Sequence, residues 1–203
     1  MTSATDKPRY IHCLVVAVVL WVVLCGCRSS TPLAPVRVVD LIHEMDRADM
    51  RPAGGFAIAM QHVDGVVRPA IAATVPSRLT IALPLPRHGA FHALVALADG
   101  PPGAMAAPVR LRVGVSDHRI YEGVTELILT PGTRTWIDLR ADLSAYAGWK
   151  WSLFYRPDRI TWRVVLAADA TENVPATVLW LAPEIITDTE SAREYSARRQ
   201  RLR

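Results

Sequence analysis

The sequence predicts an all-β protein, an antiparallel β-sandwich or jelly roll, with a short helix before the sandwich and a basic helical tail after it. Three observations support this fold class. From Phe56 onward, apolar and polar side chains alternate with a period of two in many short segments. The 15 Pro and 11 Gly are spread along the chain and end these segments at short intervals. Hydrophobic residues make up 51% of the 203 residues, which is enough to build a core.

The N-terminal segment has the features of an export signal. Lys7 and Arg9 precede an apolar run over residues 13–24, and the segment ends in Leu24-Cys25-Gly26-Cys27. The run is shorter than the ~20 apolar residues that a helix needs to span a bilayer, so a signal peptide is favoured over an uncleaved signal anchor. The ending resembles the lipobox of bacterial lipoproteins.

The lipobox resemblance implies removal of residues 1–26 and acylation of the thiol of Cys27. Residues 27–36 would then be the lipidated cysteine and a polar, Pro-containing tether that holds the domain near a membrane. In some lipoproteins the inner-membrane retention signal is Asp after the cysteine, whereas this chain has Arg28. The resemblance therefore favours a cell-envelope protein anchored in the outer membrane over one in the inner membrane.

Cysteine content and charge exclude several classes of site. Cys13 and Cys25 would leave with the signal peptide, so the mature chain would have no disulfide, no thiolate metal site and no catalytic cysteine. The formal net charge is +4, and five arginines lie within residues 187–203. The body of the domain is close to neutral, which argues against a nucleic-acid-binding groove.

The domain is predicted to cover residues 37–186. Val38, Leu41, Ile42, Met45 and Ala48 are spaced as on an amphipathic helix, which the Pro52-Ala-Gly-Gly55 sequence would end. Period-two segments follow, and the clearest has Leu111, Val113 and Val115 inward with Arg110 and Arg112 outward. The strands are predicted at 56–63, 66–73, 78–85, 90–98, 109–116, 120–124, 126–130, 135–139, 149–156, 161–168 and 177–181.

The C-terminal residues 187–203 have a polar, helical composition and a basic end. Their arginines would suit anionic lipid headgroups or lipopolysaccharide phosphates, and the alternative is a frayed, solvated tail.

No catalytic motif is found, so we predict that the protein is not an enzyme and needs no cofactor. His88 and His92 have the spacing of helical metal ligands, but they straddle the start of a predicted strand and no third ligand is evident. Asp138 and Asp142 are paired carboxylates near a strand end, and Asp142 is better explained as the cap of the turn that follows it. We therefore predict no metal site.

Two further polar groups were weighed as metal ligands. His43, Glu44 and Asp46 scatter around the predicted helix, which favours a solvated polar face. Asp169, Glu172 and Asn173 would suit a calcium loop, but a plain turn is the better explanation.

The distribution of aromatic side chains is the feature of the sequence that indicates a ligand-binding site. Five tryptophans lie between residues 136 and 180, and flat aromatic faces stack on the C–H faces of sugar rings. The alternative is that these rings fill the core of the sandwich. Trp162 and Trp149 are the candidate sugar-stacking residues, with Arg156 and Asp158 as a charged clamp from the adjoining loop. Trp162 shares a face with Val164 and Leu166, which also fits a core position.

The segment Asp142-Leu-Ser-Ala-Tyr-Ala-Gly148 and the strand after it resemble a signature of galactose-binding-like jelly-roll domains. The later Trp180-Leu-Ala-Pro-Glu-Ile185 is similar to the closing strand of the same group. The resemblance covers about residues 109–186. It implies a fold found in carbohydrate-binding modules and carries over no binding residue, because sugar sites in that group vary in place.

The sequence thus predicts a lipid-anchored, non-catalytic domain that binds a glycan or another envelope component. The alternative is a structural lipoprotein that docks an envelope protein and has no sugar site. An exposed Trp beside Arg and Asp in a groove would favour the first, and a broad exposed apolar patch on one sheet would favour the second.

Overall fold

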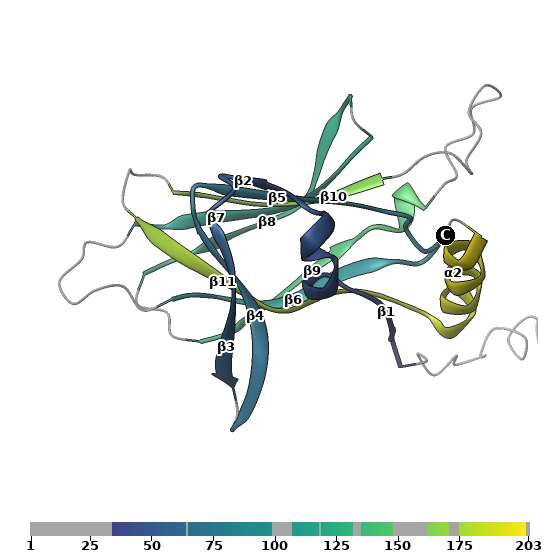
Figure 1. The fold of residues 1–203 in the computed structure, drawn as a ribbon, viewed down its shortest axis with the longest axis horizontal. Helices are drawn as coiled ribbons and strands as arrows, with labels where there is room; N and C mark the ends of the chain where they lie inside the picture. The colour runs from purple at the N-terminus through teal and green to yellow at the C-terminus, as the bar shows by residue number, and fades with distance from the viewer. Residues whose placement is uncertain are drawn as a thin grey trace, which may run out of the picture. The chain divides into compact units, whose positions relative to one another are not determined.

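The computed structural model describes residues 34–63, 65–98, 107–117, 119–131, 135–147, 162–170 and 175–201. Within these residues two antiparallel sheets lie face to face, which confirms the predicted β-sandwich (Figure 1). Sheet A has the strand order β3 (Phe56–Val63), β4 (Val66–Val75), β11 (Ala176–Thr187), β6 (Ala90–Leu97) and β9 (Ile137–Asp142), with β1 (Val36–Asp40) also paired to β11. Sheet B has the order β2 (Asp49–Arg51), β5 (Ser77–Leu83), β10 (Trp162–Ala170), β7 (Val109–Ser116) and β8 (Tyr121–Leu129).

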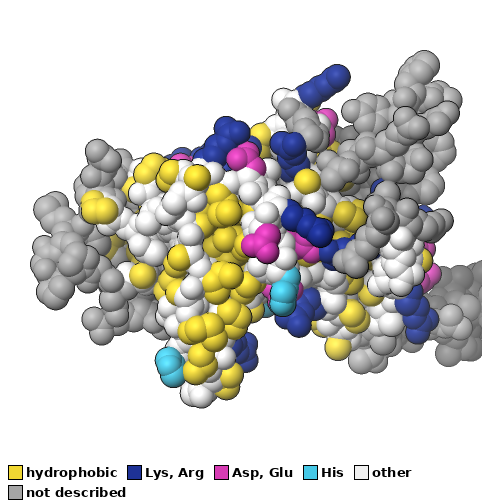
Figure 2. Space-filling view, viewed as in Figure 1, with side chains coloured by type: hydrophobic (Ala, Val, Ile, Leu, Met, Phe, Trp, Pro, Cys, Tyr) yellow, Lys and Arg dark blue, Asp and Glu magenta, His cyan; other side chains and the backbone are white. Residues whose placement is uncertain are grey.

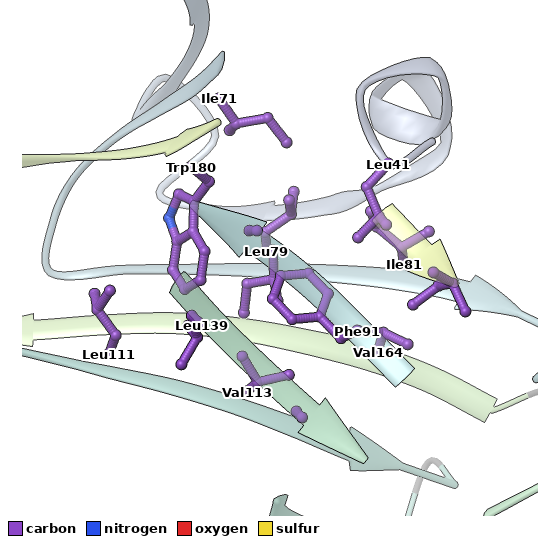
Figure 3. Packing of buried hydrophobic residues seen from close by; sticks show 14 of the residues in the cluster. Leu41, Ile71, Leu79, Ile81, Phe91, Leu111, Val113, Leu139, Val164 and Trp180 are labelled. Carbon is purple, nitrogen blue, oxygen red and sulfur yellow. The ribbon is translucent and has the colours of Figure 1, made fainter. Parts of the chain in front are cut away.

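The core lies between the two sheets and is built from the inward positions of each strand. Trp180 on β11 and Phe91 on β6 are 2% and 0% exposed, and their rings meet edge to face with centroids 6.2 Å apart. Figure 3 shows these two rings among aliphatic side chains from both sheets, such as Ile71 of sheet A and Val113 of sheet B. Because successive side chains of a strand point to opposite faces, the period-two pattern of the sequence is what fills this layer.

The predicted N-terminal helix is shorter than expected and is preceded by a strand. Val36–Asp40 pairs with β11, and only Ile42–Arg47 (η1) is helical, as a 3-10 helix. Val39 and Leu41 are 2% and 0% exposed, so this stretch also carries a period-two pattern. The sequence fits both periods, and pairing with the neighbouring β11 decides for the strand.

Strand β8 joins two segments that the sequence pattern separated. Residues 120–124 and 126–130 were predicted as two strands, whereas β8 runs continuously from Tyr121 to Leu129. The register against β7 shifts between Val113 and Gly114, so one residue of β8 bulges and the alternation of its side chains is interrupted. The predicted strand at 149–156 lies outside the described residues.

The predicted C-terminal helix is confirmed as α2 (Thr189–Arg201), which lies beside β1 at one end of the sandwich (Figure 1). Asp188 begins it: its carboxylate accepts hydrogen bonds from the backbone N–H of Ser191 at 2.8 Å and from the hydroxyl of Ser191 at 3.0 Å. Tyr195 is 4% exposed and belongs to the core, and the guanidinium of Arg199 forms an ion pair with Glu44 of η1. The helix is therefore docked on the sandwich rather than frayed.

None of the helices in the described part of the chain is long and apolar enough to cross a membrane.

Candidate functional site

Four of the five residues predicted from the sequence for lipidation or ligand binding lie outside the described part of the chain. These are the lipidation candidate Cys27 and three ligand candidates, Trp149, Arg156 and Asp158. The fourth ligand candidate, Trp162, begins β10. Its ring is half-buried and packs against the core, edge to face with Tyr146 at a centroid distance of 5.5 Å. The role of Trp162 in ligand binding stays a prediction.

Tyr146 of this aromatic pair also contacts Glu122 through its hydroxyl group. Burial of its hydroxyl and its hydrogen bond to Glu122 raise the pKa of Tyr146 to about 12. Tyr146 and Trp162 thus tie the turn after β9 to sheet B, as core positions do.

The paired carboxylates Asp138 and Asp142 are engaged separately. Asp138 Oδ1 lies 3.2 Å from Nε2 of His92, and Glu184 Oε1 lies 3.1 Å from the other ring nitrogen of His92. Asp142 Oδ1 accepts the backbone N–H of Ser144 at 2.9 Å, which confirms it as the residue that caps the turn. Hydrogen bonds from Ser144 hold the pKa of Asp142 below its usual range.

Three other residues considered as metal ligands, His43, Glu44 and Asp169, are paired with protein side chains. His43 Nδ1 lies 3.3 Å from Asp40, and Glu44 is paired with Arg199. Asp169 forms an ion pair with Arg112, whereas residues 172 and 173 lie outside the described part. No group of three or more ligating side chains suited to a metal occurs in the described ranges.

A groove of about 490 Å³ lies on the outer face of sheet B, the face turned away from the core. Volumes of this order are typical of small-ligand sites. Its lining comes from five strands and the segments beside them: Arg51, Pro52, Pro76, Ser77, Arg78, Arg112, Tyr121, Val165, Ala167 and Asp169.

The register of sheet B gives the floor of the groove. Val165 of β10 lies between Thr80 of β5 and Gly114 of β7. One row further, Ala167 lies between Arg78 and Arg112. Val165 and Ala167 point outward and are still 0% and 8% exposed, because the longer side chains around them cover the small floor.

Tyr121 supplies an aromatic ring beside this floor. Its side chain reaches diagonally from β8 over Gly114, and a Cβ on Gly114 would lie 2.6 Å from Tyr121 Cε2 and 2.7 Å from its hydroxyl oxygen. Only glycine leaves room for the ring there. Tyr121 is 38% exposed, and the guanidinium carbon of Arg78 lies 5.5 Å from the ring centroid, within the range of a cation–π contact.

Two ion pairs fix charged side chains around the groove. The guanidinium of Arg112 binds Asp169 across the β7–β10 pair, and this hydrogen bond raises the pKa of Arg112. Nε of Arg112 is buried and has no acceptor in the described part of the protein. Arg51 pairs with Asp49 at 3.1 Å on exposed β2.

The groove therefore combines one half-exposed ring, a small-residue floor, guanidinium donors and one carboxylate acceptor. Sequence alternation did place Arg112 on the outward face of its strand. It did not assemble the groove, because Arg78, Arg112, Tyr121 and Asp169 come from four strands whose pairing is not readable from local spacing.

The similarity of this chain to known proteins is a similarity in fold. No protein-family profile and no curated protein matches the sequence. Similar solved structures include the CBM22-1 xylan-binding domain of Paenibacillus barcinonensis Xyn10C, with a TM-score of 0.46 and 13% identity over 76% of this chain and 96% of that chain.

Two further similar structures are carbohydrate-binding modules as well. A CBM28 module described as specific for non-crystalline cellulose has a TM-score of 0.41 and 9% identity, over 64% of this chain and 79% of that chain. The structure of CBM51-2 with INT domains from Clostridium perfringens ZmpB has a TM-score of 0.42 and 15% identity, over 64% of this chain. This chain spans only 25% of that structure's length.

Proposed function

We propose that this domain is a non-catalytic sugar-binding module and that the groove on sheet B is its binding site. The observation that carries the proposal is the ring of Tyr121, seated on Gly114 at the border of the groove, beside Arg78 and the Arg112–Asp169 pair. A sugar ring has apolar C–H faces and a rim of hydroxyls. An aromatic surface with directed donors and acceptors around it matches both parts.

The polar side chains of the groove suit binding more than catalysis. Asp169, the carboxylate that lines the groove, is held in place by Arg112 and presents oxygen acceptors for hydroxyl groups. General acid–base hydrolysis of a glycoside uses a second carboxyl group across the scissile bond. The proposal therefore assigns Tyr121 to stacking and the Arg112–Asp169 pair to orienting the sugar.

A glycan array followed by calorimetric titration of the best ligand tests the site. Tyr121→Ala should weaken binding by about ten-fold or more, because a lost aromatic contact is worth about 0.5–1.5 kcal/mol beyond its buried area. Tyr121→Phe keeps the ring and should retain most of the affinity. Ile128→Ala, at an exposed position on the same strand, is the matched control. Equal affinities for wild type and Tyr121→Ala would refute the assignment of the groove.

The sequence-based candidates form a second location for the sugar site. If Trp149, with Arg156 and Asp158, stacks on the sugar instead, Trp149→Ala should abolish binding and leave stability within about 0.5 kcal/mol, as expected for a surface residue. A loss of stability of about 3–5 kcal/mol would identify Trp149 as a core residue.

We also propose that the domain is held at a membrane through Cys27. A single acyl chain binds membranes marginally, whereas two or more hold a protein stably, so the lipobox-like ending is sufficient as an anchor. Metabolic labelling with an alkyne fatty acid should mark the wild type and leave Cys27→Ser unlabelled. Equal labelling of both would contradict the anchor.

A second candidate function, docking to another protein surface, is favoured by one observation. The hairpin β3–β4 exposes Ile58, Met60, Val66 and Val67, each between 47% and 60%. Figure 2 shows hydrophobic side chains gathered in this part of the surface. We propose a second copy of this chain as the occupant. β3 is an edge strand whose eight residues include no charged side chain, so two copies can pair antiparallel without repulsion.

Sedimentation at increasing protein concentration tests this pairing. Wild type should shift toward a dimer, and Ile58→Lys with Met60→Lys should keep the chain monomeric, because charges on an edge strand oppose edge-to-edge pairing. A wild type that stays monomeric at high concentration would rule the second copy out.

A further inference from the structure

We propose that the groove on sheet B selects sugars that carry an anionic group, whether carboxylate, sulfate or phosphate. This inference rests on the proposed sugar-binding function and adds the chemical class of the ligand. It is carried by the placement of three arginines in the register of the sheet and by the partners that each of them has.

The arginines occupy one row across neighbouring strands. Arg51 of β2 pairs directly with Arg78 of β5, and Arg78 pairs with Ala167 of β10, which in turn pairs with Arg112 of β7. Three of the first four positions in this row carry a guanidinium group, and the fifth, Glu126 of β8, pairs with Arg112. All three arginines line the groove.

The direct pairing of Arg51 with Arg78 places like charges opposite each other. Side chains of directly opposed residues on one sheet face lie close together, and like charges there are destabilising. An anion bound between them would relieve the repulsion. Neutral hydroxyl groups would not.

The carboxylates around the groove leave one guanidinium unmatched. Asp49 pairs with Arg51, and Asp169 pairs with Arg112. Arg78 contacts the Tyr121 ring and has no ion pair with the described carboxylates. Glu126, opposite Arg112, forms an ion pair with Arg110 of the same strand as Arg112. With four guanidinium groups and three carboxylates, this part of the surface still carries an excess positive charge.

The chemistry of the guanidinium group favours an acidic partner. It presents donors in a planar fork that matches two oxygens of a carboxylate, sulfate or phosphate. Arg78 in contact with the face of Tyr121 keeps these edge donors for a ligand. The Tyr121 ring can then bind the sugar, while Arg78 binds the acidic substituent.

Asp169 orients the ligand within the groove. Its carboxylate repels an anion, so the acidic substituent should lie toward Arg51 and Arg78, and the hydroxyl groups toward the Arg112–Asp169 pair. The groove thus has an anion end and a hydroxyl end.

Calorimetric titration of the full domain with four probes tests the inference. The probes are hexagalacturonate, a heparin hexasaccharide, the neutral galactose hexamer and polyglutamate of similar charge. Hexagalacturonate or the heparin hexasaccharide should bind at least about ten-fold more tightly than the neutral hexamer, and the preference should shrink as ionic strength rises. The two acidic sugars distinguish a carboxylate from a sulfate as the preferred group.

Variants identify the groups responsible. Arg78→Ala should weaken binding of the acidic sugar by at least about ten-fold and that of the neutral hexamer by less than about three-fold. Arg78→Lys should restore part of the affinity, because it keeps the charge and loses the fork. Arg68→Ala removes the same charge from an exposed position on β4 of sheet A and should leave binding unchanged.

The outcomes separate this inference from the proposed function. Equal binding of acidic and neutral sugars, with loss in Tyr121→Ala, would overturn the anion preference and leave sugar binding intact. Binding of polyglutamate as tightly as the acidic sugars, unaffected by Tyr121→Ala, would overturn sugar binding and leave an anion site. Binding of none of the four probes would overturn both.

Discussion

The outer faces of the two sheets use charged side chains in different ways. On sheet A, His92 lies between Asp138 and Glu184, and Arg37 lies 3.9 Å from Glu184 and 3.3 Å from Asp40. On sheet B, Arg51 and Arg78 are direct cross-strand neighbours, and Arg78 has no ion pair with the described carboxylates.

Apolar side chains differ between the faces as well. Sheet A buries a small outer cluster of Val63, Ala70 and Leu181, against which Leu94 and Trp136 pack. Sheet B has a floor of small residues and a half-exposed ring. Packing of the outer cluster on sheet A serves stability, whereas sheet B carries the groove that we propose as the ligand site. The two faces therefore differ in the direct cross-strand pairing of Arg51 with Arg78 and in the groove beside these residues, both on sheet B.

The largest expected effect is on the outer cluster of sheet A. Leu181 is 1% exposed, so Leu181→Ala should lower the free energy of unfolding by about 2–5 kcal/mol through lost burial and the cavity left behind. Urea unfolding measures the change, with Ile128→Ala on sheet B as an exposed control. A loss below about 1 kcal/mol would show that the cluster is not part of the stabilising core.

The next largest effect is expected at Gly114, the residue over which the Tyr121 ring lies. Gly114→Ala places a methyl group 2.6 Å from both Tyr121 Cε2 and the backbone oxygen of Glu122, so it should destabilise by about 1–3 kcal/mol and weaken glycan binding. Gly123→Ala is the matched control, because the nearest atom to its new methyl group, the Tyr121 hydroxyl, would be 3.9 Å away. Similar unfolding midpoints and affinities for both variants would contradict the close packing of the Tyr121 ring on Gly114.

A smaller effect on stability is expected at the N-terminus of α2, the helix that packs beside β1 of sheet A. Asp188→Ala removes the N-terminal cap of α2 and should cost about 1 kcal/mol at neutral pH, whereas Asp188→Asn should keep most of the cap. The hydrogen bond from the backbone N–H of Ser191 lowers the pKa of Asp188. The contribution of the ionised carboxylate is thus present above its unfolded pKa of about 3.9 and is lost as pH falls through the lower folded value.

The stability difference between wild type and Asp188→Ala should therefore shrink below about pH 4, and unfolding curves at several pH values measure it. A difference that is constant from pH 7 to pH 2 would show that the carboxylate does not act as the cap.

The smallest effect is expected for the exposed ion pairs of sheet A. Arg37 is 58% exposed, so Arg37→Ala should change the free energy of unfolding by no more than about 0.5 kcal/mol. Thermal unfolding at low and high salt measures it. A loss above about 1 kcal/mol at low salt would mean that this network contributes more to stability than ordinary surface pairs do.

Local patterns in the sequence predicted much of the fold. The alternation in Val109–Ser116 gave β7 within its observed bounds, and the polar composition after Asp188 gave α2. Asp142 was predicted as a cap, and it is one. These features depend on neighbours within a few residues, so local chemistry is sufficient to predict them.

Residues that satisfy two periods were not predictable in the same way. Val38, Leu41 and Ile42 fit a helix, while Val39 and Leu41 fit a strand, and pairing with β11 decides between them. Asp169 was weighed as a calcium ligand and instead binds Arg112, which is 57 residues away in the chain. Both outcomes depend on which strand lies alongside.

The sequence by itself determined the β-sandwich class, the inward and outward faces of most strands and the presence of a helix at the C-terminus. Only the tertiary structure decided which outward residues meet. Arg51, Arg78 and Arg112 are ordinary outward arginines in the sequence, and they become one row because β2, β5, β10 and β7 are neighbours in sheet B. Side-chain alternation is fixed by backbone geometry within a strand, whereas strand order follows from burying the whole apolar surface at once.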